Sequence, residues 1–157
     1  MLAAKYRVYD SAILDAPIEE VWPVLRDILR VLPLVFGDGV KDFKWVEGGS
    51  AENIPSRFQF TLQATGESVQ EEVSGRSETE HSVTYRMIGQ AVGITGYIAT
   101  YQLRPITSEP GKTFIDWVRD FAIAPGNDPE KVAPFLASLA TQEMAALKKH
   151  FSKSSSA

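Results

Sequence analysis

The stretch Lys112–Ile123, KTFIDWVRDFAI, constrains the fold more than any other, because polar and apolar residues alternate along it. Such alternation is typical of a β-strand with one buried face. It places Trp117 and Phe121 on the same face as Arg119. A cation in such a row must reach solvent, pair with a carboxylate or meet a ligand. We therefore expect Arg119 to have either a carboxylate partner, with Glu71 as the candidate, or space beside it for a ligand.

A long amphipathic segment follows this strand after a short turn. The sequence Asn127-Asp128-Pro129 is a favourable helix start, because Asp caps helices and Pro is tolerated in the first turn. Apolar residues then recur at helical spacing up to the C-terminal end of the pattern. They are Val132, Phe135, Leu136, Leu139, Ala140, Met144, Leu147 and Phe151. The pattern predicts one long C-terminal helix with a broad apolar face.

The remainder of the chain predicts a sheet with two short helices inserted near its start. A first strand spans residues 6–14, and helical spacing continues from there to about Phe36, where Pro23 and Pro33 favour two short, kinked helices over one rod. Turn-forming residues separate six later strands, at about 40–47, 55–64, 66–76, 81–88, 94–104 and 112–123. We predict an α+β fold in which a curved, seven-stranded antiparallel sheet wraps around the C-terminal helix.

Composition limits the classes of protein to consider. The chain has 157 residues, of which 44% are hydrophobic, so we expect one domain over residues 1–151 and a disordered tail over 152–157. The net charge of -4 argues against a nucleic-acid partner. No stretch approaches the roughly 20 apolar residues of a membrane span or the pattern of a signal peptide. We therefore expect a cytoplasmic protein, a monomer or homodimer, without stable membrane insertion.

Several motifs resemble the START-like, or helix-grip, superfamily (SRPBCC), and within it the polyketide cyclase and dehydrase-like branch. They are SAILDAPIEEVWPVLRD at 11–27, QEEV at 70–73, VTYRM at 83–87, GYIATYQLRPI at 96–106 and the KTFIDWVRDF strand. The resemblance covers nearly the whole chain. It implies a helix-grip fold with a hydrophobic pocket, in a superfamily of cyclases, lipid or hormone carriers, quinone-binding proteins and chaperone activators. Fold alone does not select among these activities.

Catalytic and metal-binding motifs of the common kinds are absent from the sequence. The chain has no cysteine, and its two histidines, His81 and His150, lie far apart at positions typical of surface or capping residues. Neither a histidine-based triad nor a metal-ligand spacing can be assembled from them. We predict no metal site and no cofactor.

Inward-facing positions instead predict a pocket lined with aromatic residues, one acid and one base. The candidate ligand-binding residues are Phe58, Phe60, Glu71, Tyr85, Met87, Tyr97, Tyr101, Trp117, Arg119, Phe121, Leu136 and Leu139. Such a lining suits a flat, mainly apolar molecule that a few polar groups orient. The same positions would also serve as an ordinary packed core, with Arg119 paired to a carboxylate or stacked on an aromatic ring.

Three functions are consistent with this pattern. We favour binding or transport of a small hydrophobic ligand, such as a lipid, a quinone or an aromatic polyketide-like molecule, over catalysis. The alternative is a cyclase or dehydrase in which Glu71 is the general acid or base, and Arg119 with Tyr85 or Tyr101 stabilises an enolate. The third hypothesis is an interaction protein, such as a chaperone activator or an antitoxin-like partner, that uses an exposed sheet face.

Overall fold

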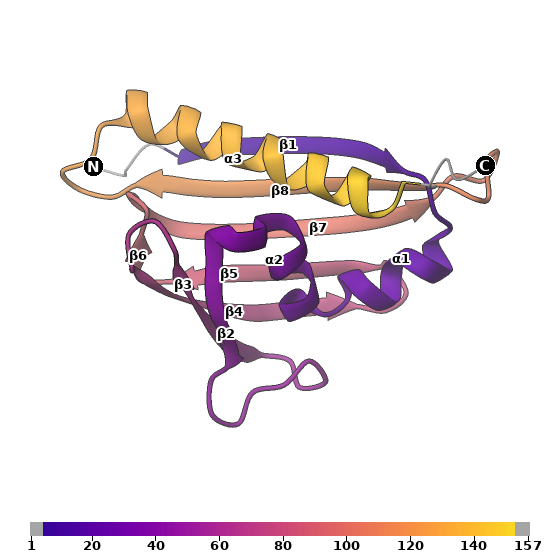
Figure 1. Cartoon of the computed structure of the whole chain (residues 1–157), viewed down its shortest axis with the longest axis horizontal. Helices are drawn as coiled ribbons and strands as arrows, with labels where there is room; N and C mark the ends of the chain where they lie inside the picture. Colours follow the sequence, from indigo (N-terminus) through magenta and orange to yellow (C-terminus); the bar gives the residue numbers. More distant parts are fainter. Residues whose placement is uncertain (1–4, 153–157) are drawn as a thin grey trace.

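A single antiparallel sheet curves around the C-terminal helix in the computed structural model, which describes residues 5–152 (Figure 1). The sequence predicted this architecture, including the two short helices after the first strand. The predicted tail over 152–157 lies outside the described residues except for Ser152. In chain order the elements are β1 Lys5–Leu14, α1 Ile18–Leu25, α2 Ile28–Phe36, the 3-10 turn η1 Gly37–Gly39, β2 Val40–Trp45, β3 Ser56–Leu62, β4 Ser68–Ser77, β5 Ser82–Ile88, β6 Gln90–Ala91, β7 Ile94–Pro105, β8 Thr113–Ile123 and α3 Pro129–His150.

The strands follow the order β1-β8-β7-β5-β4-β3-β2, and β6 pairs only with β7. All of these pairs are antiparallel. The seven strands of the main path are those that the sequence predicted. The two-residue β6 was not predicted, because a pairing this short leaves no periodic pattern.

Three register shifts bend the sheet. One extra residue lies between Lys41 and Lys44 of β2, another between Val73 and Gly75 of β4, and a third between Thr95 and Ile98 of β7. A bulge of this kind locally increases the twist and bends the strand. In β7 the shift includes Gly96, whose φ of 63° is accessible to glycine at little cost. These bends let the sheet close over α3 and leave space beneath it.

Aspartate side chains cap the starts of α2 and α3. The side chain of Asp27 accepts a 3.0 Å hydrogen bond from the Leu29 amide and so starts α2 directly after α1. Asp128 caps α3 in the same way by accepting from Glu130 N, and Lys148, Lys149 and His150 occupy its last turn. Among residues 5–152, no helix combines the length and apolarity needed to cross a bilayer.

The apolar face of α3 is narrower than the sequence pattern indicated. Its fully packed stripe consists of Leu136, Ala140, Glu143, Met144 and Leu147. Phe135 was predicted to be on this face, but 53% of it is exposed. The prediction was wrong because Phe135 lies about 120° around the helix from the middle of the stripe, given 3.6 residues per turn.

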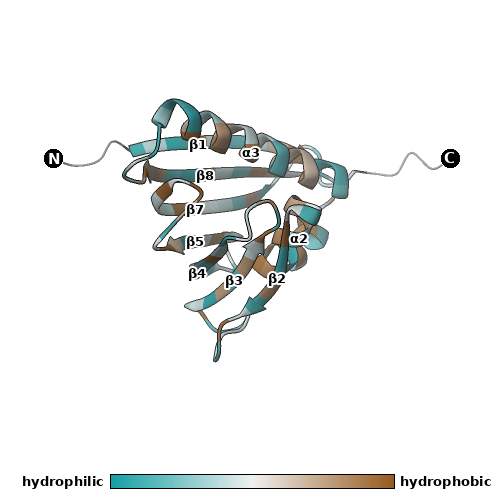
Figure 2. Ribbon diagram, turned by 60° about the vertical axis from the view of Figure 1, so that its left-hand side comes forward, coloured by the Kyte–Doolittle hydropathy of each residue, from teal (hydrophilic) through white to brown (hydrophobic). Residues whose placement is uncertain are grey.

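The helices cover one face of the sheet. In Figure 1, α3 runs lengthwise beside β1 and β8, while α1 and α2 lie over the strands toward β4. In Figure 2, hydrophobic and hydrophilic segments alternate along the strands, in agreement with the alternating burial of β7 and β8. The Tyr101 hydroxyl donates a hydrogen bond to the Leu25 carbonyl and so fixes the end of α1 to the centre of the sheet. The helices α2 and α3 contact each other over the concave side of the sheet.

Candidate functional site

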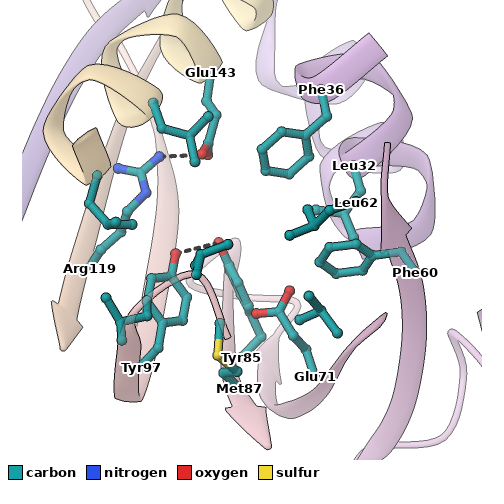
Figure 3. A pocket seen from close by; sticks show the side chains of 15 residues that line it. Leu32, Phe36, Phe60, Leu62, Glu71, Tyr85, Met87, Tyr97, Arg119 and Glu143 are labelled. Carbon is teal, nitrogen blue, oxygen red and sulfur yellow. Dashed lines mark hydrogen bonds and ion pairs between the residues drawn. The ribbon is translucent and has the colours of Figure 1, made fainter. Parts of the chain in front are cut away.

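A partly open cavity lies between the concave face of the sheet, α2 and α3 (Figure 3). It contains about 610 Å³ of space free of protein atoms, including the solvent at its opening. Its lining is mostly apolar. The lining residues are Leu32, Phe36, Phe60, Leu62, Val69, Glu71, Tyr85, Met87, Val92, Ile94, Tyr97, Arg119, Leu136, Leu139 and Glu143.

The structure brings most of the sequence-predicted site residues to this cavity. Eight of the twelve line it: Phe60, Glu71, Tyr85, Met87, Tyr97, Arg119, Leu136 and Leu139. The other four, Phe58, Tyr101, Trp117 and Phe121, lie in the packed core beside it, each at most 2% exposed. Alternation identifies the face on which a residue lies, but it does not reveal which part of that face is covered by other side chains.

Glu71 is a buried carboxyl without a partner. It lies in β4 between Val69 and Val73, is 5% exposed, and its carboxyl group points into the cavity in Figure 3. Within residues 5–152, no group donates a hydrogen bond to it and no cation pairs with it. Burial, together with the negative charge of Glu143, raises the pKa of Glu71 to about 8. At neutral pH this side chain is therefore mainly an uncharged acid that faces the cavity.

Arg119 pairs with Glu143, which the sequence analysis did not identify. The Nη2 atom of Arg119 donates to Oε2 of Glu143 at 2.9 Å, and its Nη1 lies 3.6 Å from Oδ2 of Asp10. The expectation that Glu71 would be the partner was wrong. A signal for Glu143 was present, since it lies four residues after Leu139 and four before Leu147, within the apolar stripe of α3. A charged residue in such a stripe needs a buried partner.

The guanidinium of Arg119 is almost completely covered. Its side chain is 2% exposed and lies over the ring of Trp117, with 4.1 Å between Cζ and the ring centroid. Its Nε and Nη1 atoms are buried and form no hydrogen bond. Burial lowers the pKa of Arg119, but the neighbouring Glu143, Tyr85 and Tyr97 together outweigh this effect, and the net shift is upward. Burial also raises the pKa of Glu143, and Arg119 opposes that rise.

A short chain of hydrogen bonds brings two phenol groups to the cavity. The indole Nε1 of Trp117 donates to the Tyr85 hydroxyl at 3.2 Å, and the Tyr85 and Tyr97 hydroxyls lie 3.4 Å apart. The two hydroxyls have two protons, and the bond between them uses one. Trp117 donates its own proton to Tyr85, so one hydroxyl proton of the pair remains to donate. Burial raises the pKa of both phenols above the ordinary value, so they stay protonated.

The turn between β6 and β7 adds a residue that has no signal in the sequence. Val92 lines the cavity from this turn with a φ of 50°, which is rare for a β-branched residue. Its amide donates to Oε1 of Glu67 at 3.4 Å. The next residue, Gly93, approaches α3 so closely that a Cβ there would lie 3.0 Å from Val132. Only backbone geometry of this kind, which side-chain periodicity does not encode, brings Val92 to the cavity.

Metal coordination has no evident basis in the described part of the chain. Over residues 5–152, no group of three or more His, Asp or Glu side chains is placed to hold a metal ion. The polar groups of the cavity are two carboxyls, two phenols and one covered guanidinium. Their chemistry is that of hydrogen bonding and proton transfer.

Residues 5–152 match a sequence profile of a known protein family, which is described as polyketide cyclase/dehydrase and lipid transport. The chain belongs to this family. The match confirms the resemblance that the motifs indicated. No curated protein matches the sequence.

Several solved structures match this member of the polyketide cyclase/dehydrase and lipid transport family over almost the whole chain. A protein from Nitrosospira multiformis is 24% identical, with a TM-score of 0.75 over 96% of this chain and 99% of its own. Truncated norcoclaurine synthase from Thalictrum flavum is 12% identical, with a TM-score of 0.75 over 98% of this chain and 97% of its own. A protein from Bacillus thuringiensis is 20% identical, with a TM-score of 0.75 over 94% of this chain and 100% of its own. At these identities the likeness establishes the helix-grip fold.

Proposed function

We propose that the protein binds a small, mainly apolar molecule in the cavity between the sheet, α2 and α3. The observation that carries this proposal is the arrangement of the lining, with an apolar wall opposite a few polar groups. Leu32 and Phe36 of α2, with Phe60 of β3, face the side that carries Arg119 and Glu143 (Figure 3). An apolar lining with few, well-placed polar groups is typical of a small-molecule site. Membership of a family of cyclases, dehydrases and lipid transporters supports the same assignment.

Filling the cavity should abolish this binding. Leu136 lines the cavity, whereas its neighbour Phe135 points to solvent, so L136W adds an indole inside and F135W changes only the surface. We expect the wild type and F135W to enhance the fluorescence of the apolar probe N-phenyl-1-naphthylamine. L136W should weaken its binding by roughly tenfold or more, because the added ring occupies the space.

Circular dichroism melting shows whether each variant remains folded, and V69F provides a second way of filling the cavity from the sheet side. Equal probe binding by L136W, V69F and F135W would place the probe elsewhere and contradict the proposal. The absence of any enhancement by the wild type would contradict it as well.

A cyclase or dehydrase activity is the second candidate, and one observation favours it. The Glu71 carboxyl has no partner among the described residues, points into the cavity and has a pKa of about 8, within the range of a useful general base. Its carboxylate would take a proton from the carbon next to a ketone. The C–H electron pair would form the C=C bond of the enolate while the C=O π pair moves to the oxygen, and the free hydroxyl proton of the Tyr85–Tyr97 pair would hydrogen-bond to this enolate oxygen.

Deuterium incorporation into 1-tetralone in D₂O, followed by NMR, tests this chemistry without knowledge of the natural substrate. We expect the enzyme-dependent rate to rise with pH through about 8, as Glu71 ionises. E71Q should lower this rate by about 100-fold, whereas E72Q should not, because Glu72 lies on the opposite face of β4, paired with Arg57 and Arg86. An E71Q protein with the wild-type rate would exclude the proposed base.

A further inference from the structure

The polar groups that face the cavity include more carboxyl groups than cations. The cavity lining includes two carboxyl groups, from Glu71 on β4 and Glu143 on α3, and one cation, Arg119 on β8. In Figure 3 both carboxyl groups are directed toward the space between the walls. The single cation is directed to Glu143 rather than to the space. The cavity therefore offers more acceptors than cationic donors.

Glu143 and Asp10 prevent Arg119 from acting as an anion site. Glu143 binds its Nη2 atom at 2.9 Å, and Asp10 lies 3.6 Å from its Nη1. Its Nε and Nη1 atoms are buried. An anionic head group would have to displace Glu143 to reach this cation, and it would also meet the negative charge of Glu143 itself.

Glu71 is the group whose hydrogen-bonding capacity is most clearly left unused. Only 5% of Glu71 is exposed, its carboxyl group points into the cavity, and it lacks a partner among residues 5–152. The two phenols supply only one free hydroxyl proton between them and carry no charge. A cationic donor is the partner that a carboxyl in this setting binds most strongly.

We infer that the ligand carries a protonated amine, held between Glu71 and Glu143, and that the cavity selects cationic over anionic forms of an apolar molecule. This inference rests on the proposed binding function and specifies the class of ligand. The apolar body of the molecule would lie against Leu32, Phe36 and Phe60. Fatty acids and other carboxylates would be poor ligands.

Three probes that differ only in the head group test the inference. They are 1-naphthylmethylamine, 1-naphthylmethanol and 1-naphthoic acid, each used to displace N-phenyl-1-naphthylamine and then measured directly by calorimetry at pH 7.5. We expect the amine to bind most tightly and the acid most weakly, with about 100-fold or more between them. E71Q should weaken amine binding by about tenfold and change alcohol binding much less, because the alcohol carries no charge. E72Q, one residue away on the other sheet face, should change neither.

The pH dependence separates a charge effect from a merely structural one. Amine binding ionises Glu71 and releases its proton, so amine affinity should rise relative to alcohol affinity by up to about tenfold per pH unit below pH 8. The titratable groups facing Glu71 are Tyr85 of β5, Tyr97 of β7, Arg119 of β8 and Glu143 of α3. If the rise of amine affinity with pH is lost in E71Q, ionisation of Glu71 is its cause. If the rise persists in E71Q, Glu143 is its cause, and the proposed role of Glu71 is overturned.

The outcomes are distinguishable from those of the proposed function. If the apolar probe binds but the acid displaces it as well as the amine does, or the amine does not displace it, the inference is overturned and the binding function stands. Equal amine affinity of E71Q and E72Q also overturns it. If the apolar probe and all three naphthyl compounds fail to bind, the binding function fails, and the inference with it.

Discussion

Replacement of Glu143 by alanine is expected to lower the free energy of unfolding by about 3–5 kcal/mol, which is a large fraction of the stability of a typical domain. The reason is the charge that remains. Arg119 is 1% exposed, and its Nε and Nη1 already lack hydrogen bonds. Loss of Glu143 therefore leaves Asp10, at 3.6 Å, as the single carboxylate that pairs with this buried cation among residues 5–152. Urea denaturation at pH 7, followed by circular dichroism, measures the effect.

A double replacement distinguishes the buried charge from lost packing. R119M/E143L removes both charges and keeps similar side-chain volumes, so its stability should return close to that of the wild type. D120A removes an exposed partner of Arg7 on the other face of the same strand, and its loss should be much smaller. Losses of the same size in E143A and D120A, or no recovery in R119M/E143L, would show that burial of the charge is not the cause.

The second large effect concerns pH and Glu71. Because its pKa in the folded protein, about 8, is above the ordinary value of 4.5, the folded state holds a proton that the unfolded state releases. This contribution to stability is complete below about pH 4.5 and is lost as pH rises through 8. The expected loss is about 5 kcal/mol, at about 1.4 kcal/mol for each pH unit of the interval.

E71Q provides the comparison, because glutamine has a similar shape and does not ionise. Its free energy of unfolding should match that of the wild type near pH 4.5 and exceed it by several kcal/mol at pH 8.5. E72Q should show no such divergence between pH 5 and 8, since its ion pairs with Arg57 and Arg86 lower the pKa of Glu72 and confine its titration to more acidic solution. Parallel stability curves for E71Q and the wild type would mean that Glu71 is ionised when folded.

The strands and their buried faces were predictable because their signal is local. Alternation along β8 correctly placed Arg119 beside Trp117 and Phe121 in the interior. The pairing of Arg119 with Glu143 has no such local signal, because it depends on how α3 is rotated and translated over the sheet. The sequence contained Glu143 within an apolar stripe, but several acids were available, and Glu71 occupies a similar setting on β4.

The boundary between cavity and core was not predictable for the same reason. Trp117 and Tyr101 face inward like Tyr85, yet Tyr101 is covered where its hydroxyl meets the end of α1. Leu32 and Phe36 join the lining because α2 packs opposite α3. The cytoplasmic location, the oligomeric state and the hypothesis of an interaction protein concern properties outside a single folded chain, and they stay predictions.

The two walls of the cavity come from separate parts of the chain, and this separation has a consequence for how the family can diversify. Leu32, Phe36, Phe60 and Leu62 belong to α2 and β3, in the first half of the sequence. The Arg119–Glu143 pair belongs to β8 and α3 at the other end. Substitutions in the first wall can change the size and shape of the molecule accepted without leaving one charge of the buried pair unpaired. Relatives of this chain should therefore differ more freely along α2 and β3 than at the paired charges.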